Sequence, residues 1–156
     1  MAQHPFIPRS LVGKRITHVA RVLYEYRGEV DPGDGALELG LDGQTLLLDG
    51  ESDGERLRVS EQPWVDPFEE PLSEENRRFV ETHGKWRRVD CSRSDVYSGL
   101  LGQVITDACA LNNKFGTLAG LRISVPTAGI WFVVDGDESH VYWAQPIGFT
   151  EVKSRR

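Results

Sequence analysis

Few residues of this sequence stand where they could perform acid–base chemistry. His18 lies in a run of alternating apolar residues, and the matching position of a similar later run is Asp107. His140 opens another such run. A histidine beside a carboxylate can act as a general base, because the carboxylate orients the ring and stabilises its charged form. His18, Asp107 and His140 are therefore the candidate catalytic residues, with a surface or hydrogen-bonded role as the simpler interpretation of each.

Two acidic stretches, DGESDGE at 49–55 and DGDESH at 135–140, have the composition of cation sites but not the spacing. A helix-loop-helix calcium site needs oxygen ligands at alternating positions and a glutamate at position twelve. Counted from Asp49, position twelve is Ser60, and counted from Asp135 it is Pro146. The sequence therefore predicts no metal here, and the alternative is a cation site of non-standard spacing. Both Asp-Gly pairs instead predict equivalent hairpin turns, because Asp and Gly tolerate positive φ.

Other catalytic motifs are missing from the sequence. It contains no phosphate-binding loop, dinucleotide fingerprint, nucleophile elbow or HExxH motif. Cys91 and Cys109 stand alone, without a CxxC pair or zinc spacing. We therefore expect no cofactor, and a binding role is favoured over catalysis.

Charge is distributed unevenly along the chain. The net charge is −6, but residues 25–75 hold sixteen acidic and three basic residues, a balance of −13, which leaves +7 for the rest. An acidic face attracts basic partners and accelerates their association. The alternative is that folding intermixes the two sets of charges. The predicted binding residues are the acids of this segment beside turn formers, with one tryptophan: Asp31, Asp34, Glu51, Asp53, Glu55, Trp64, Glu69 and Glu70.

The neighbours of the four tryptophans predict different environments for them. Trp64 lies among prolines, where an exposed aromatic can anchor an interface. Trp86 lies in KWRRV, which mixes bases with an aromatic as nucleic-acid sites do, but one short basic run on an acidic protein is weak evidence, so nucleic acid is not the expected partner. Trp131 and Trp143 lie in apolar runs and are predicted to belong to the core.

The segments that would position these residues occur in two similar copies along the chain. LVGKRITHVARV (11–22) resembles LLGQVITDACAL (100–111), GQTLLLDG (43–50) resembles GIWFVVDG (129–136), and Gln62-Pro63 resembles Gln145-Pro146. The matches occur in the same order, at offsets of 89, 86 and 83. An ordered series predicts an internal repeat, 11–65 and 100–149, with shorter turns in the second copy.

Alternating apolar residues predict four strands in each copy, at 15–26, 36–41, 45–49 and 56–59, and again at 104–111, 121–125, 130–135 and 141–145. Residues 28–35 are predicted to be a loop. Between the copies, residues 73–84 predict a short helix, with Ser73 as its N-cap and Gly84 at its end. We expect a mainly β protein in which two four-stranded antiparallel meanders, related by a pseudo-twofold, form a closed barrel or a two-sheet sandwich, with one helix in the connection 66–99.

A chain of 156 residues without a long apolar run or signal peptide is expected to be one cytoplasmic domain, 1–156, outside the membrane. Three functions fit. The first is an acidic binding protein for a basic protein partner, resembling bacterial immunity proteins in charge and size alone. The second is a small-molecule-binding barrel or cofactor-free enzyme that uses its interior. The third is an assembly protein that forms a homodimer.

Overall fold

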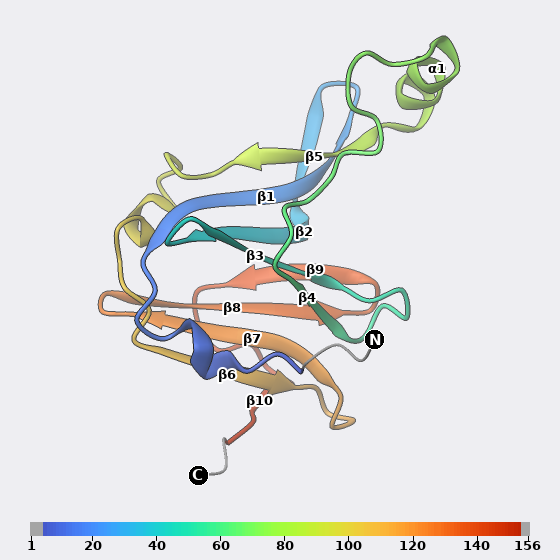
Figure 1. Ribbon diagram of the computed structural model, residues 1–156. Helices are drawn as coiled ribbons and strands as arrows, with labels where there is room; N and C mark the ends of the chain where they lie inside the picture. Colours follow the sequence, from blue (N-terminus) through green and yellow to red (C-terminus); the bar gives the residue numbers. More distant parts are fainter. Residues whose placement is uncertain (1–4, 154–156) are drawn as a thin grey trace.

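The computed structural model describes residues 5–153 and consists of two five-stranded antiparallel sheets (Figure 1). The first sheet has the order β4-β3-β2-β1-β5. Its strands are β1 (Ile16–Tyr26), β2 (Glu29–Leu41), β3 (Gln44–Gly50), β4 (Leu57–Ser60) and β5 (Lys85–Asp90). The second sheet has the order β10-β6-β7-β8-β9. Its strands are β6 (Asp107–Asn112), β7 (Leu118–Val125), β8 (Ala128–Asp135), β9 (Glu138–Tyr142) and β10 (Thr150–Glu151). The predicted mainly β class is confirmed.

Each sheet contains a four-stranded meander, and each has a fifth strand beside the first strand of that meander. In the first sheet β5 pairs with β1, and in the second β10 pairs with β6. Strand β5 lies inside the predicted connection, where it was missed because KWRRVD has polar side chains on both faces. The two sheets form two layers and do not close into one continuous barrel (Figure 1).

The prediction of a loop at 28–35 is wrong, because Gly28 belongs to the turn with Arg27 and residues 29–35 form the first part of β2. Leu23 pairs with Gly35, whereas the next residue, Tyr24, pairs with Asp31, so residues 32–34 bulge from the ladder. A bulge tolerates proline, since its residues need not donate to the neighbouring strand.

The two Asp-Gly pairs are not equivalent turns. Gly136 and Asp137 have φ of 55° and 69° and form the two-residue turn between β8 and β9. This turn lies one residue after the predicted Asp135-Gly136 pair, because Asp135 is the last residue of β8 and pairs with Glu138. The prediction for Asp49-Gly50 is wrong: both residues lie in β3, paired with β4, and the chain turns over residues 51–56. The shorter turn in the second sheet agrees with the falling offset between the sequence matches.

Reciprocal backbone hydrogen bonds join the two halves where residues 13–16 lie beside residues 102–105. The Gly13 N–H donates to the Ile105 carbonyl at 2.8 Å, and the Gly102 N–H donates to the Ile16 carbonyl at 2.8 Å. The Ile16 and Ile105 N–H groups donate to the residue after the opposite glycine, at 2.9 and 2.8 Å. Both glycines follow a 3₁₀ helix, Pro8–Leu11 or Ser98–Leu100, and have positive φ, 91° and 77°. This symmetry is compatible with a duplicated meander.

The main core lies between the sheets and takes alternate residues from both. Its fully buried members include Val19, Leu37, Leu39, Leu48, Ile123, Ile130 and Phe132. The prediction for Trp143 is wrong, because this residue follows β9 and is 39% exposed. Trp131 is half-buried and packs against a smaller cluster around Val133 and Phe149.

The predicted helix is confirmed as α1 (Glu74–His83), at one end of the first sheet (Figure 1). The Ser73 hydroxyl accepts a hydrogen bond from the Asn76 N–H at 3.1 Å, and Gly84, with φ of 76°, ends the helix. Within residues 5–153, no helix is both long and apolar enough to span a bilayer.

Candidate binding cleft

Residues 61–68, here called the covering segment, lie across the outer face of the first sheet. The sequence Leu-Glu-Leu in β2 puts two leucines in the core and turns Glu38 to the opposite face. The Glu38 carboxylate accepts the Trp64 N–H at 2.9 Å and the Arg88 guanidinium at 3.0 Å. Arg88 also donates to the Trp64 carbonyl at 2.6 Å. One buried carboxylate and one arginine therefore fix both backbone polar groups of Trp64.

The Trp64 side chain completes a small apolar cluster on this outer face. It packs against three buried residues, Val22, Ala36 and Leu47, one from each central strand. Burial of this ring favours the position that the hydrogen bonds to Glu38 and Arg88 define.

A cleft of about 660 Å³ opens between the covering segment, α1 and the turn between β8 and β9. We call one part of its lining the aromatic group: Tyr24, Trp64, Phe68, Phe79 and Trp86. Tyr24 and Trp86 meet edge to face with ring centroids 5.4 Å apart, and Phe68 stacks on Phe79 at 5.5 Å. Phe79 and Trp86 are 48% and 41% exposed, so the cleft presents aromatic surface to solvent.

Four carboxylates, here called the acidic group, also line the cleft: Asp34, Asp49, Glu51 and Asp137. Asp34 accepts the Ser139 N–H at 2.7 Å and so joins the two sheets, and Asp49 pairs with Arg58 at 2.9 Å. Glu51 and Asp137 are exposed and have no ion-pair partner among residues 5–153. Two carboxylates of this group are therefore free to meet a cation.

Among the described residues that line the cleft, Lys85 is the only lysine or arginine, and it already forms an ion pair. The Lys85 ammonium donates to the Asp66 carboxylate at 2.7 Å. His83 also lines the cleft, with its ring 4.7 Å from that of Phe79. The electrostatic balance of the cleft is therefore acidic.

Folding intermixes part of the charge, as the alternative interpretation of the sequence anticipated. Six acids of segment 25–75 form ion pairs within the described chain, and strand β5 supplies the base for three of them. Those three pairs are Glu25–Arg87, Glu38–Arg88 and Asp66–Lys85. Among the seven acids predicted to bind a partner, only Asp53 is in an ion pair with another residue of the range 5–153.

The structure brings three predicted binding residues into the cleft: Asp34, Glu51 and Trp64. Asp53 lies in the adjoining turn, where its carboxylate accepts the N–H groups of Glu55 at 2.9 Å and Arg56 at 3.0 Å. These hydrogen bonds hold the pKa of Asp53 below its usual value. Asp53 therefore maintains the turn, whereas Glu55 is exposed beside it.

The other predicted binding residues lie outside the cleft lining. Asp31 accepts the Gly33 N–H at 2.9 Å within the bulge of β2. Glu69 and Glu70 are exposed beyond the covering segment, and Glu70 accepts the Leu72 N–H at 3.2 Å. Asp31 and Glu70 thus support local turns.

His18 and Asp107 do not form the predicted pair. The His18 Nδ1 atom is 3.4 Å from the Ser92 hydroxyl and 4.0 Å from the Asp90 carboxylate. A serine hydrolase relay needs its serine and its carboxylate at opposite nitrogens of the ring, whereas both residues here approach Nδ1. The Ser92 hydroxyl also accepts the Val19 N–H at 3.0 Å, which indicates a structural role.

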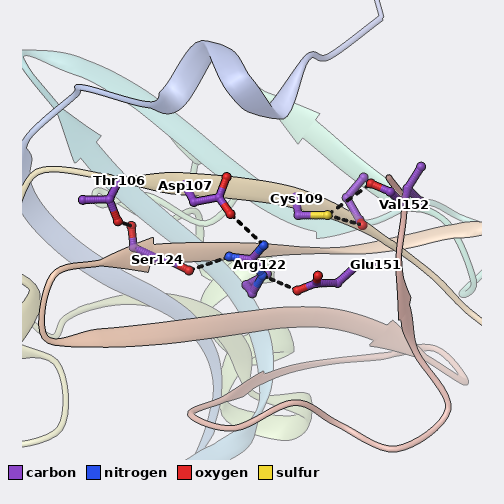
Figure 2. Close-up of polar contacts among 8 residues, drawn as sticks. Thr106, Asp107, Cys109, Arg122, Ser124, Glu151 and Val152 are labelled. Atoms are coloured by element: carbon purple, nitrogen blue, oxygen red, sulfur yellow. Dashed lines mark hydrogen bonds and ion pairs between the residues drawn. The ribbon is translucent and has the colours of Figure 1, made fainter. Parts of the chain in front are cut away.

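Asp107 belongs to a cluster on the second sheet (Figure 2). The Arg122 guanidinium donates to Asp107 at 2.9 Å, to the Ser124 hydroxyl at 2.5 Å and to Glu151. Although burial lowers the pKa of Arg122, the hydrogen bonds to Asp107 and Glu151 raise it overall. A permanently charged arginine neutralises Asp107, and its bond to Glu151 fastens β10 to the sheet.

Cys109 lies beside this cluster and its thiol donates to the Val152 carbonyl at 3.2 Å (Figure 2). Burial, together with the nearby Glu151, raises the pKa of the Cys109 thiol, so it stays protonated at neutral pH and is a poor nucleophile. The contact secures the C-terminal segment.

His140 pairs with Glu138, two residues earlier in β9, at 3.3 Å. The catalytic candidates are therefore in three separate places, each with its own local partner. Among residues 5–153, no three His, Cys, Asp or Glu side chains are grouped so as to hold a metal ion. The absence of a metal or cofactor remains a prediction.

Comparison with family models, curated proteins and solved structures yields no match to this chain.

Proposed function

We propose that this chain is an acidic binding protein for a basic protein partner, acting as an immunity- or antitoxin-like inhibitor. The observation that carries the proposal is the pair of exposed carboxylates, Glu51 and Asp137, which have no ion-pair partner among residues 5–153 and lie in the lining of an aromatic cleft. Aromatic side chains supply much of the affinity at protein interfaces, whereas exposed carboxylates steer a basic partner during encounter.

The distribution of apolar side chains supports binding at the surface. A barrel that bound a ligand internally would need polar groups around an open interior. The space between the sheets is instead occupied by buried aliphatic residues and Phe132. The cleft extends from the outer face of the first sheet, beside Trp64, to the turn between β8 and β9, where a protein surface can reach it.

The test begins with affinity capture from the native cell extract at low and high salt, followed by kinetics with the purified partner. Glu51→Lys combined with Glu55→Lys reverses two exposed charges and leaves the turn-forming Asp53 intact. We expect normal folding, since exposed charges contribute only about 0–1 kcal/mol per pair to stability. We expect the association rate to fall about tenfold or more at low salt and the effect to shrink as salt screens the charges.

The matched control is Glu81→Lys combined with Asp95→Lys. Both residues are exposed and outside segment 25–75, and the change in net charge is the same. The control should associate faster than the Glu51/Glu55 variant. An unchanged association rate for the Glu51/Glu55 variant at low salt would mean that this face is not the interface.

A further inference from the structure

Backbone hydrogen bonds of Gly54 hold the two exposed carboxylate residues of the cleft, Glu51 and Asp137, in place. The Gly54 N–H donates to the Glu51 carbonyl at 3.0 Å, and the Gly54 carbonyl accepts the Asp137 N–H at 3.0 Å. One buried glycine thus bonds to the backbones of both residues. A Cβ atom at position 54 would lie 1.8 Å from the Asp137 carboxylate, so glycine is needed for this close approach. The position of Asp137 is therefore set by the fold, although its side chain is exposed.

The part of the lining around Trp64 is apolar, and hydrogen bonds hold the backbone of Trp64 in place. Val22 and Ala36 form the floor beside Trp64, whose backbone is held by Glu38 and Arg88. The base that could neutralise the cleft, Lys85, already pairs with Asp66. A ligand that fits must carry positive charge for the carboxylates and an apolar part for the aromatic group.

We propose that the residue seated in this cleft is an arginine of the basic protein partner, with its guanidinium toward Glu51 and Asp137 and its aliphatic stem along Trp64. This inference rests on the proposed function. Arginine combines an apolar stem with a planar cation that stacks on aromatic rings and forms paired hydrogen bonds with carboxylates. Lysine carries a compact, strongly hydrated charge and gains less from aromatic contact.

The size of the cleft indicates that the arginine comes from a chain segment. A volume of about 660 Å³ is in the range of sites for drug-sized ligands, which exceeds one side chain. An apolar residue beside the arginine would cover Phe68 and Phe79, which stack on each other. The preferred segment therefore has an arginine next to an apolar residue.

The first test uses capped dipeptides as probes, with binding followed by tryptophan fluorescence and by NMR chemical shifts. Acetyl-Leu-Arg-amide should bind the intact protein and perturb signals of Trp64 and Trp86. The citrulline analogue has nearly the same shape without the charge, and it should bind about tenfold or more weakly, because charge-assisted hydrogen bonds are lost. Equal binding of the two peptides would overturn the proposal in favour of a simple apolar groove.

The second test changes the carboxylates without changing their size. Glu51→Gln combined with Asp137→Asn should weaken the binding of the arginine peptide about tenfold. Asparagine tolerates the positive φ of position 137, so folding should be retained. The matched control, Glu61→Gln combined with Asp95→Asn, removes the same charge at two exposed residues outside the cleft lining and should alter binding less than twofold. Equal losses in both variants would indicate nonspecific attraction and overturn the proposal.

Kinetics with the captured partner separate this inference from the proposed function. Loss of short-range contacts should accelerate dissociation of the Glu51→Gln, Asp137→Asn variant. If charge reversal at Glu51 and Glu55 slows association but this variant dissociates at the normal rate, the acidic interface stands and the arginine site is wrong. If agmatine, a free guanidinium amine, binds more tightly than the peptide and no partner is captured, the cleft serves a small cation and both proposals fail.

Discussion

Glu38 is the residue on which the candidate site most depends, although it does not line the cleft. Its side chain is 8% exposed and accepts hydrogen bonds from the Trp64 backbone and from Arg88. A buried carboxylate is tolerated only where its charge is paired and its oxygens accept hydrogen bonds. The position of Trp64 thus depends on one acidic residue in the middle of an apolar strand, together with Arg88.

We predict that Glu38→Ala lowers the free energy of unfolding by about 1–3 kcal/mol, because the Trp64 N–H and part of the Arg88 guanidinium lose their acceptor. Glu38→Gln keeps an acceptor and should cost less than alanine. Urea denaturation followed by tryptophan fluorescence gives both values. Glu61→Ala, at an exposed residue of the same covering segment, should stay within about 0.5 kcal/mol of the original protein. A loss at Glu61 as large as at Glu38 would contradict this assignment.

At the scale of elements, β5 converts the connection between the halves into part of the first sheet. Its pairing with β1 brings Lys85 to Asp66, at 2.7 Å, and Arg88 to Trp64. The covering segment is therefore attached to an edge strand through two side chains. Lys85 and Asp66 are 19% and 22% exposed, so their ion pair is partly shielded from solvent.

This attachment should weaken in acid. Burial raises the pKa of Asp66, but the hydrogen bonds from Lys85 and from the Phe68 N–H outweigh it and hold the pKa below its ordinary value of 3.8. Because the folded form has the lower pKa, the stabilisation is complete well above pH 3.8 and is lost as the pH falls through the folded value. Asp66→Asn should therefore cost about 1 kcal/mol at pH 7 and nothing once Asp66 is protonated. Urea denaturation at pH 7, 5, 4 and 3 checks this, and a pH-independent cost would contradict it.

The sequence allowed most strands to be predicted, because an alternating apolar pattern directly reflects one buried face. Runs such as ALELGL and LRISV were assigned for that reason. Strand β5 could not be found in this way, since its pairing depends on the backbone of β1 and its side chains are mostly exposed. The bulge of β2 was hidden by turn-forming residues, because proline and glycine are equally compatible with loops and bulges.

The candidate site was only partly predictable. Trp64, Asp34 and Glu51 were identified from composition and local charge, and all three line the cleft. Asp137 was treated only as part of a turn, because its place beside Gly54 depends on a contact between residues more than eighty positions apart. Phe68, Phe79 and Trp86 carry no local pattern that indicates a shared surface.

At the scale of the whole molecule, the two halves meet at Gly13 and Gly102, which make equivalent backbone hydrogen bonds. Each glycine has positive φ, and a Cβ atom at either position would meet no atom within 4 Å. The two positions therefore present the same backbone requirement with the same free space. Their N–H groups donate to equivalent isoleucines at the same distance, 2.8 Å.

We predict that Gly13→Ala and Gly102→Ala destabilise the protein by similar amounts, about 1 kcal/mol each, because alanine is strained in this backbone region and nothing else changes. Equilibrium urea denaturation of the two single variants measures the costs. Gly54→Ala is the contrasting case, since the added Cβ would also clash with Asp137, and its cost should be larger. Costs for Gly13 and Gly102 that differ by more than about 1 kcal/mol would contradict the equivalence.

The contact between Gly54 and Asp137 also bears on when the protein becomes competent during its synthesis. The hairpins of the first sheet close over short stretches of chain, which is fast, whereas contacts across more than eighty residues form late because long loops cost more entropy. Asp137 and Ser139 leave the ribosome after all strands of the first sheet, because synthesis proceeds from the N-terminus. A nascent chain would therefore carry the first sheet and its aromatic side chains before it carried a complete cleft, so partner recognition would begin only after the second sheet had been made.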